Sequence, residues 1–140
     1  MRWFLLILLP FVFLTGCISA TPEKLGGIII TDDLLFVEKG IASYYADSFG
    51  GKTTASGDVY IPEEFSAAHQ TLPFGTLVLV KSVSGRKFVV VRINDRGPFI
   101  GERRIDLSRA AAKKLGIIAS GIAKVEIFVI PERSRLAAML

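Results

Sequence analysis

The chain has 140 residues, of which 51% are hydrophobic and 21% are charged, and it contains one Cys and one His. This length allows one domain of ordinary size, and the composition excludes intrinsic disorder, collagen-like repeats and acidic low-complexity tails. A single Cys excludes a disulfide framework and a Cys-based zinc site, and a single His excludes an all-histidine metal site. We therefore expect neither a metal nor a cofactor.

The N-terminus has the pattern of a secretory signal. Arg2 supplies a positive charge, residues 3–14 form an unbroken apolar run, and small residues precede Cys17. The run is shorter than the ~20 apolar residues of a membrane-spanning helix. This arrangement is typical of a signal peptide, here residues 1–16, that is removed from the mature protein.

Residues 14–17, Leu-Thr-Gly-Cys, resemble the bacterial lipobox, in which the Cys is acylated and becomes the first residue of the mature protein. The resemblance implies a membrane anchor on Cys17, because several acyl chains hold a protein far better than one. Ile18 follows the Cys, and in sorted lipoproteins a residue other than Asp there favours the outer membrane, facing the periplasm. The alternative is an uncleaved anchor helix with an incidental Cys.

The charge of the chain argues against nucleic acid as a partner. The formal net charge is +4, and loss of Arg2 with the signal would reduce it to +3. This mild basic excess contains no run of Lys and Arg, whereas nucleic-acid-binding domains gather such residues on one face.

Residues 17–39 are expected to form a tether, because Pro22 and the Gly26-Gly27 pair interrupt regular structure. The segment 28–37 is more apolar than a free linker should be. It either docks on the following domain as an extra strand or meets a partner protein.

From residue 40 onwards the pattern is that of β-strands. Residues 40–45 form a short candidate strand, and the β-branched runs 76–80 and 88–93 predict a hairpin closed by a Ser84-Gly85 turn. The apolar run 123–130 predicts a last strand. Such nearly continuous runs indicate strands buried on both faces or a small closed barrel with a filled interior.

One helix is predicted directly after Ser108, whose side chain can cap its first turn. Leu107, Ala111 and Leu115 share one face at four-residue spacing, which indicates packing against a core. Gly116 fits the position just after the helix, where a left-handed conformation is common.

Three polar segments adjoin the predicted strands, at residues 54–58, 69–75 and 94–99. Since the chain lacks a nucleophile elbow, a Walker loop and a dinucleotide fingerprint, its chemistry has to come from carboxylates, hydroxyls or His. Asp58 and Asp95 lie where loops project from a rigid scaffold, which is where sites tend to form. Both could equally be ordinary turn residues.

The remaining candidates also have plain structural interpretations. His69 could be a hydrogen-bonded core or loop histidine. Tyr44 and Tyr45 could stack on a sugar ring or pack inside the barrel. Asp106 could support the start of the predicted helix through the helix dipole.

Taken together, the segments resemble rare lipoprotein A, a family of septal-ring lytic transglycosylases. The matching stretches cover nearly all of residues 40–130, in order: 40–45, 49–58, 67–76, 91–99 and 104–112. The resemblance implies a mainly β fold, a six-stranded double-psi β-barrel with one short helix, preceded by a lipoprotein signal peptide. The barrel would span residues 40–130, with 131–140 as a tail, and the same barrel occurs in expansins.

The resemblance also implies an activity. Family members cut peptidoglycan glycan strands between N-acetylmuramic acid and N-acetylglucosamine, prefer strands without stem peptides, and leave a 1,6-anhydro end. The C6 hydroxyl of the sugar is the nucleophile, so one protonated acid suffices where hydrolases typically need a second group. Such an acid needs burial or a neighbouring carboxylate to keep its proton near neutral pH.

Family position assigns the active site to Asp58, His69 and Asp95, with Asp95 or Asp58 as the acid/base. It assigns glycan contacts to Tyr44, Tyr45, Arg96 and Asp106.

Three features depart from the family pattern. Asp58 stands where Glu is common, and Tyr44 stands where Trp is common, so a carboxylate and a stacking platform are altered. Many members continue into a C-terminal domain that binds denuded glycan, whereas this sequence ends at Leu140, so septal targeting by such a domain is not expected. The alternative function is a non-catalytic, expansin-like glycan-binding lipoprotein, with an envelope or division protein as an unidentified partner.

Overall fold

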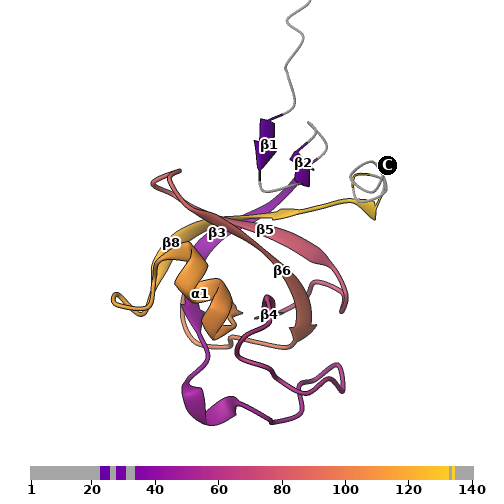
Figure 1. Ribbon diagram of the computed structural model, residues 1–140, viewed down its shortest axis with the longest axis vertical. Helices are drawn as coiled ribbons and strands as arrows, with labels where there is room; N and C mark the ends of the chain where they lie inside the picture. The colour runs from indigo at the N-terminus through magenta and orange to yellow at the C-terminus, as the bar shows by residue number, and fades with distance from the viewer. Residues whose placement is uncertain (1–22, 26–27, 31–33, 133, 135–140) are drawn as a thin grey trace, which may run out of the picture.

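Six strands close into a barrel in the computed structural model, which describes residues 23–25, 28–30, 34–132 and 134 (Figure 1). In spatial order the strands are β3 (Leu35–Tyr44), β7 (Arg103–Leu107), β4 (Ser66–His69), β6 (Phe88–Asp95), β5 (Leu77–Ser82) and β8 (Ala123–Val129). The pairs β3–β7 and β4–β6 run parallel, and the other neighbours run antiparallel. The mainly β fold, with its six-stranded barrel, is confirmed.

The interior of the barrel is filled by small and branched apolar side chains. In β6, Val89, Val91 and Ile93 alternate with more exposed residues and are at most 4% exposed. This alternation is expected of a small barrel, in which every second side chain points inward. Their inward-facing partners include Ala42, Ala67, Val78, Val80, Ile105, Leu107, Val125 and Ile127.

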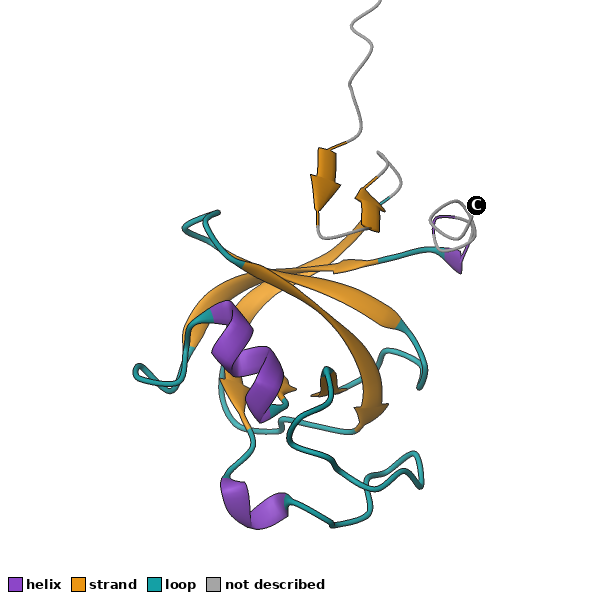
Figure 2. Ribbon diagram, viewed as in Figure 1, coloured by secondary structure: helices purple, strands orange, loops and turns teal. Residues whose placement is uncertain are grey.

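The predicted helix is confirmed as α1 (Arg109–Leu115), which packs on the barrel beside β6 (Figure 2). The side chain of Ser108 accepts a hydrogen bond from the backbone N–H of Ala111 at 3.3 Å, and Ala111 and Leu115 are buried. Gly116 ends the helix in the left-handed conformation with φ of 81°. A Cβ at this position would lie 2.5 Å from Nζ of Lys87, so the flexible Lys87 side chain would have to move.

The hairpin between β5 and β6 is confirmed, and Gly85 donates its backbone N–H to the carbonyl of Ser82 at 2.7 Å in the turn. The start of the domain differs from the prediction, because β3 begins at Leu35 rather than residue 40. Leu35 and Phe36 pair with Val129 and Phe128 of β8, which makes part of the apolar segment a barrel strand.

Two strands of the barrel, β4 and β7, were not predicted as strands. β4 ends at His69, so this residue lies in the barrel wall and not in a loop. β7 contains Arg103, Arg104 and Asp106, and these polar residues break the apolar pattern by which a strand is predicted from sequence. Both are short and are held in place by pairing on each side.

Outside the barrel, β1 (Glu23–Leu25) and β2 (Ile28–Ile30) form a separate two-stranded antiparallel sheet. A short 3-10 helix, η1 (Asp47–Phe49), begins the long connection from β3 to β4, which lies below the barrel in Figure 1. None of the helices within the described part of the chain is long and apolar enough to cross a membrane. Cys17 and the predicted signal peptide lie outside the described residues.

Gly40 leaves room for the side chain of Arg104, which packs closely against strand β3. A Cβ at Gly40 would lie 2.2 Å from Cγ of Arg104 and 3.3 Å from the carbonyl oxygen of Glu102. Nε of Arg104 lies 3.3 Å from Oε2 of Glu38, which is also in β3.

We predict that Gly40→Ala lowers the free energy of unfolding by about 1–3 kcal/mol, the usual cost of overpacking a close contact. Urea unfolding followed by circular dichroism measures the change. Gly50→Ala is the control, because its new Cβ would meet nothing closer than 3.4 Å at an ordinary φ of −51°. Equal effects of the two substitutions would show that the close contact of Arg104 with Gly40 imposes no constraint.

Candidate active site

The register of three neighbouring strands brings two carboxylates to one face of the barrel wall. Ala68, in β4, pairs with Asp95 of β6 on one side and with Asp106 of β7 on the other. Residues directly opposite each other on paired strands project to the same face. The backbones of Asp95 and Asp106 are two strand spacings apart, about 10 Å, and only the methyl group of Ala68 lies between the two carboxylates. Ser43 of β3 pairs with Asp106 and extends this row.

A β-bulge in β6 gives Asp95 its direction. Ala67 pairs with Ile93 and the next residue, Ala68, pairs with Asp95, so Asn94 is an extra residue opposite β4. In a regular strand Ile93 and Asp95 would share a face, because side chains alternate. The bulge leaves Ile93 in the core with Ala67 and turns Asp95 to the face of Ala68, as bulges next to active sites often do.

Asp95 is held by three hydrogen-bond donors. Its Oδ1 accepts from the backbone N–H groups of Ala55, at 2.8 Å, and Arg96, at 2.9 Å. Its Oδ2 accepts from the hydroxyl of Tyr45 at 2.6 Å. These contacts fix the orientation of Asp95 from two elements, since Ala55 belongs to the long β3–β4 connection.

Tyr45 is the donor in its contact with Asp95. Burial raises the pKa of Tyr45 far above its usual value, and the hydrogen bond and negative charge of Asp95 raise it further. The charge of Asp106 acts in the same direction, which places Tyr45 within electrostatic range of both carboxylates. Its ring packs against Tyr60, with ring centres 4.6 Å apart, and against Phe49 at 5.7 Å.

Asp106 has a simpler environment. The buried hydroxyl of Ser43 donates a hydrogen bond to its Oδ1. No hydrogen bond from the described residues reaches its Oδ2. Asp95 and Asp106 therefore differ in their partners. Asp95 accepts hydrogen bonds from three donors, whereas one oxygen of Asp106 has no donor among the described residues.

Asp58 lies on the same connection as Ala55 but outside the carboxylate row. Nη1 of Arg92 donates to its Oδ2 at 3.0 Å, and the side chain of Asp58 is 42% exposed. The hydrogen bond from Arg92, and after it that from Ser56, lowers the pKa of Asp58 below its usual range. Asp58 is thus held by Arg92 on the β3–β4 connection, and strand register does not bring it into the carboxylate row.

His69 lies inside the barrel wall and is 1% exposed. Its Nδ1 accepts hydrogen bonds from the backbone N–H groups of Thr71, at 3.2 Å, and Leu72, at 3.1 Å. The proton must then be on Nε2, which donates to Oε1 of Glu38 at 2.9 Å. Both ring nitrogens of His69 are thus engaged by protein atoms within the barrel wall.

Two predicted glycan contacts are engaged by the protein itself. Tyr44 packs against the core and pairs with Leu107 of strand β7. Its hydroxyl donates a hydrogen bond to the carbonyl of Ile118 at 3.1 Å. The guanidinium of Arg96 donates to the carbonyl of Leu72 at 2.8 Å and lies 3.9 Å from the centre of the Phe74 ring. Both side chains thus position loops. Tyr45 and Asp106, in contrast, join Asp95 at the site.

Ser43, Ala55 and Ala68 are site residues that sequence analysis missed. Ser43 and Ala68 belong to the row only because of strand register, and Ala55 contributes a backbone N–H. Small side chains at these positions carry no chemical signal in a sequence.

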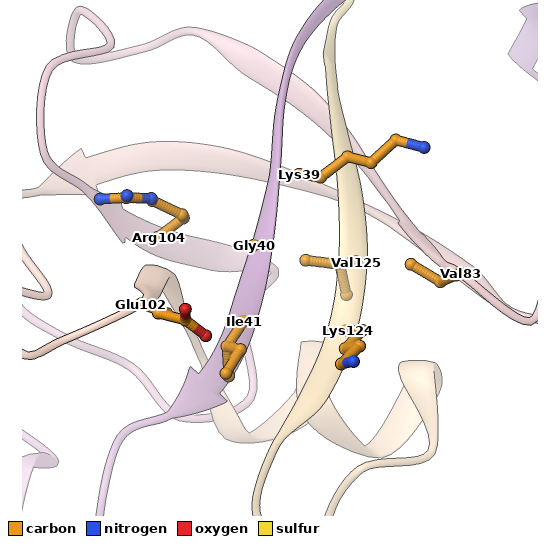
Figure 3. Close-up of a pocket in the computed structure, with 8 residues that line it drawn as sticks. All are labelled: Lys39, Gly40, Ile41, Val83, Glu102, Arg104, Lys124 and Val125. Carbon is orange, nitrogen blue, oxygen red and sulfur yellow. The ribbon is translucent and has the colours of Figure 1, made fainter.

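Two surface cavities lined by described residues lie apart from Asp95 and Asp106. A cavity of about 390 Å³ lies on the surface of β3 and β8, lined in part by Lys39, Ile41, Arg104 and Lys124 (Figure 3). Figure 3 shows Lys39 and Arg104 pointing apart, and both are paired, with Glu126 at 2.8 Å and with Glu38. Within the described part of the chain, no group of three or more His, Cys, Asp or Glu could hold a metal ion.

The closed barrel with two parallel strand pairs and one helix places the protein among the double-psi β-barrels. Residues 37–127 match the model of a family described as lytic transglycolase. The chain belongs to this family, and the resemblance to rare lipoprotein A is confirmed.

Curated relatives share about half of the aligned residues. The endolytic peptidoglycan transglycosylase RlpA of Haemophilus influenzae is 52% identical over 92 residues, which are 66% of this chain and 32% of that protein. The probable endolytic peptidoglycan transglycosylase RlpA of Treponema pallidum is 50% identical over 93 residues, covering 66% of this chain and 29% of that protein. The chain thus spans about a third of the length of these relatives.

Solved structures with a similar fold are more distant in sequence. The apo expansin of Clavibacter michiganensis superposes with a TM-score of 0.54 at 19% identity, covering 67% of this chain and 50% of that one. The Streptomyces papain inhibitor gives a TM-score of 0.54 at 26% identity, covering 71% of this chain and all of that one.

Titration of His69 tests directly whether this histidine is buried and neutral as the structure places it. Burial lowers the pKa of His69, outweighing the opposite effect of Glu38. We predict that NMR titration of its ring in the folded protein gives a pKa below the ordinary 6.5, with the proton on Nε2. The urea-unfolded chain is the control and should titrate near 6.5.

The unfolded chain then takes up a proton before the folded one as the pH falls. The free energy of unfolding should therefore decrease as the pH drops below about 6.5. A folded-state pKa at or above that of the unfolded chain would contradict the buried, neutral histidine.

Proposed function

We propose that this chain is a lytic transglycosylase that cuts peptidoglycan glycan strands between N-acetylmuramic acid and N-acetylglucosamine, leaves a 1,6-anhydro-muramyl end and prefers strands without stem peptides. The observation that carries this proposal is the placement of Asp95 and Asp106 on one face, on either side of Ala68. Membership in the lytic transglycolase family supports it. So do the names of relatives that share about half of the aligned residues.

The two carboxylates have different partners and therefore suit different roles. Asp106, whose Oδ2 has no hydrogen-bond donor among the described residues, is assigned as the acid that gives a proton to the departing glycosidic oxygen. Asp95 accepts from three donors. It is assigned as the anion that stabilises positive charge at C1 and accepts the proton of the C6 hydroxyl.

The reaction then needs no water as a nucleophile. The glycosidic C1–O bond breaks while its oxygen takes the proton of Asp106, and the C6 oxygen of the same sugar forms the new bond to C1. The C6 hydroxyl proton passes to Asp95, and exchange with solvent returns both groups to their starting state. Because the nucleophile belongs to the substrate, its attack is intramolecular and benefits from proximity.

Asp58 and His69 support this site without touching the reacting atoms in our assignment. Asp58 holds Arg92 and belongs to the connection that brings the N–H of Ala55 to Asp95. The carbonyl of His69 accepts from Arg96 at 3.3 Å, and Arg96 follows Asp95 directly. Both residues thus help to fix the surroundings of Asp95.

We predict that the 140-residue chain releases anhydro-muramyl products from peptide-free glycan strands, detected by mass spectrometry. Asp95→Asn and Asp106→Asn should each lower the rate by roughly 10²–10⁴-fold, the usual contribution of acid–base catalysis. Asp58→Asn is the matched control and should lose less, because it leaves the carboxylate row intact.

Two results would contradict the proposal. Products with ordinary reducing ends would identify a hydrolase. Sedimentation with the polymer without any product would identify a glycan-binding module, the expansin-like alternative.

We further propose that Cys17 is acylated and anchors the protein to the outer membrane, facing the periplasm. The support is the lipobox-like sequence before Cys17. Two or more acyl chains are enough for stable anchoring.

Cys17→Ser should therefore abolish incorporation of labelled palmitate and move the protein from the membrane fraction to the soluble fraction of cells. The parent chain, expressed in the same cells, is the control. Unchanged membrane association of Cys17→Ser would instead indicate an uncleaved anchor helix.

A further inference from the structure

The loop that follows Asp95 exposes two large apolar side chains. Phe99 is 75% exposed and Ile100 is 67% exposed, more than any other large hydrophobic residue in the described part of the chain. Single exposed apolar residues are ordinary, whereas adjacent exposed apolar side chains can mark a ligand-binding surface, and this pair begins four residues after Asp95.

This loop is fixed to its surroundings. The side chain of Gln70 donates to the carbonyl of Pro98 at 2.6 Å, and the backbone N–H of Arg103 donates to the carbonyl of Ile100 at 3.2 Å. Gly97 and Pro98 are buried. The exposed side chains are therefore carried by a positioned segment.

The ring of Phe99 rests on Gly97, two residues after Asp95. A Cβ at Gly97 would lie 3.8 Å from two carbon atoms of the ring, and φ of 117° at Gly97 favours glycine there. One side of the ring thus lies near the backbone while most of the side chain faces solvent. Because Phe has only two side-chain torsions, little entropy is lost when a ligand covers the ring.

Two other exposed aromatic side chains, Phe49 and Phe74, already have partners. The ring of Phe49 lies against Tyr45 and under Lys52, and that of Phe74 lies under Arg96. Phe99 has no ring or cation partner within the described residues. Tyr44, which the sequence offered as a stacking platform, is turned into the core.

We propose that Phe99, with Ile100 beside it, forms a saccharide subsite. The apolar C–H face of one pyranose of a glycan strand would lie on the Phe99 ring, while a neighbouring glycosidic bond lies at Asp95 and Asp106. This inference rests on the proposed function, because it takes the glycan as the ligand of that same site. It assigns Phe99 to substrate binding and gives it no part in the bond-breaking step.

Tryptophan fluorescence tests the subsite directly. Trp3 is the only Trp in the chain, so Trp3→Phe/Phe99→Trp carries a single reporter at the loop. Titration with soluble, peptide-free glycan strands should give a saturable blue shift of its emission. Trp3→Phe/Phe36→Trp is the matched control, because Phe36 is 54% exposed at the other end of β3 from the site; its emission should not respond.

Steady-state kinetics give the second test. Phe99→Ala should raise KM about tenfold and leave kcat unchanged, because stacking contributes equally before and during the reaction. Phe99→Trp should keep KM near that of the parent chain. Phe36→Ala should change neither constant, and thermal unfolding checks that all variants fold.

The outcomes separate this inference from the proposed function. An unresponsive reporter, an unchanged KM in Phe99→Ala, or a fall in kcat at constant KM would each overturn the subsite. If the parent chain releases no anhydro product, the proposed function fails, and the fluorescence titration alone then decides whether Phe99 binds glycan.

Discussion

One extra residue in β6, Asn94, determines where Asp95 points. Without this bulge Asp95 would follow Ile93 into the apolar interior of the barrel, since a one-residue shift turns a strand's side chains to the other face. With it, Asp95 joins Asp106 on the face of Ala68. The barrel is closed and its interior is filled, so the strands cannot slide to another register without exposing the core. The fold thus keeps the two carboxylates in place.

The residues around Asp95 and Asp106 give the two carboxylates different hydrogen-bond partners. Tyr45 keeps its proton and donates to Asp95, and the long β3–β4 connection adds the N–H of Ala55. Asp106 receives only the hydroxyl of Ser43 among the described residues. The different roles proposed for the two carboxylates rest on this difference in hydrogen-bond partners.

Local patterns in the sequence predicted the parts of the fold that depend on neighbours along the chain. The helix was found because Ser108 caps it and Gly116 ends it, and the β5–β6 hairpin was found from two apolar runs and a turn. Strand β7 was missed because its polar residues become a strand only by pairing with β3 and β4. The buried position of His69 and the bulge at Asn94 likewise come from tertiary contacts. The sequence therefore predicted some of the site residues but not the directions in which their side chains point.

The central claim is that this row of carboxylates cuts a glycan by attack of the sugar's own hydroxyl. The most direct test is to carry out the reaction in ¹⁸O-labelled water and to measure the masses of the new chain ends by mass spectrometry. Internal attack predicts anhydro ends that contain no ¹⁸O. Incorporation of one ¹⁸O at C1 of each new reducing end would show that Asp95 or Asp106 activates water instead, and would contradict the account.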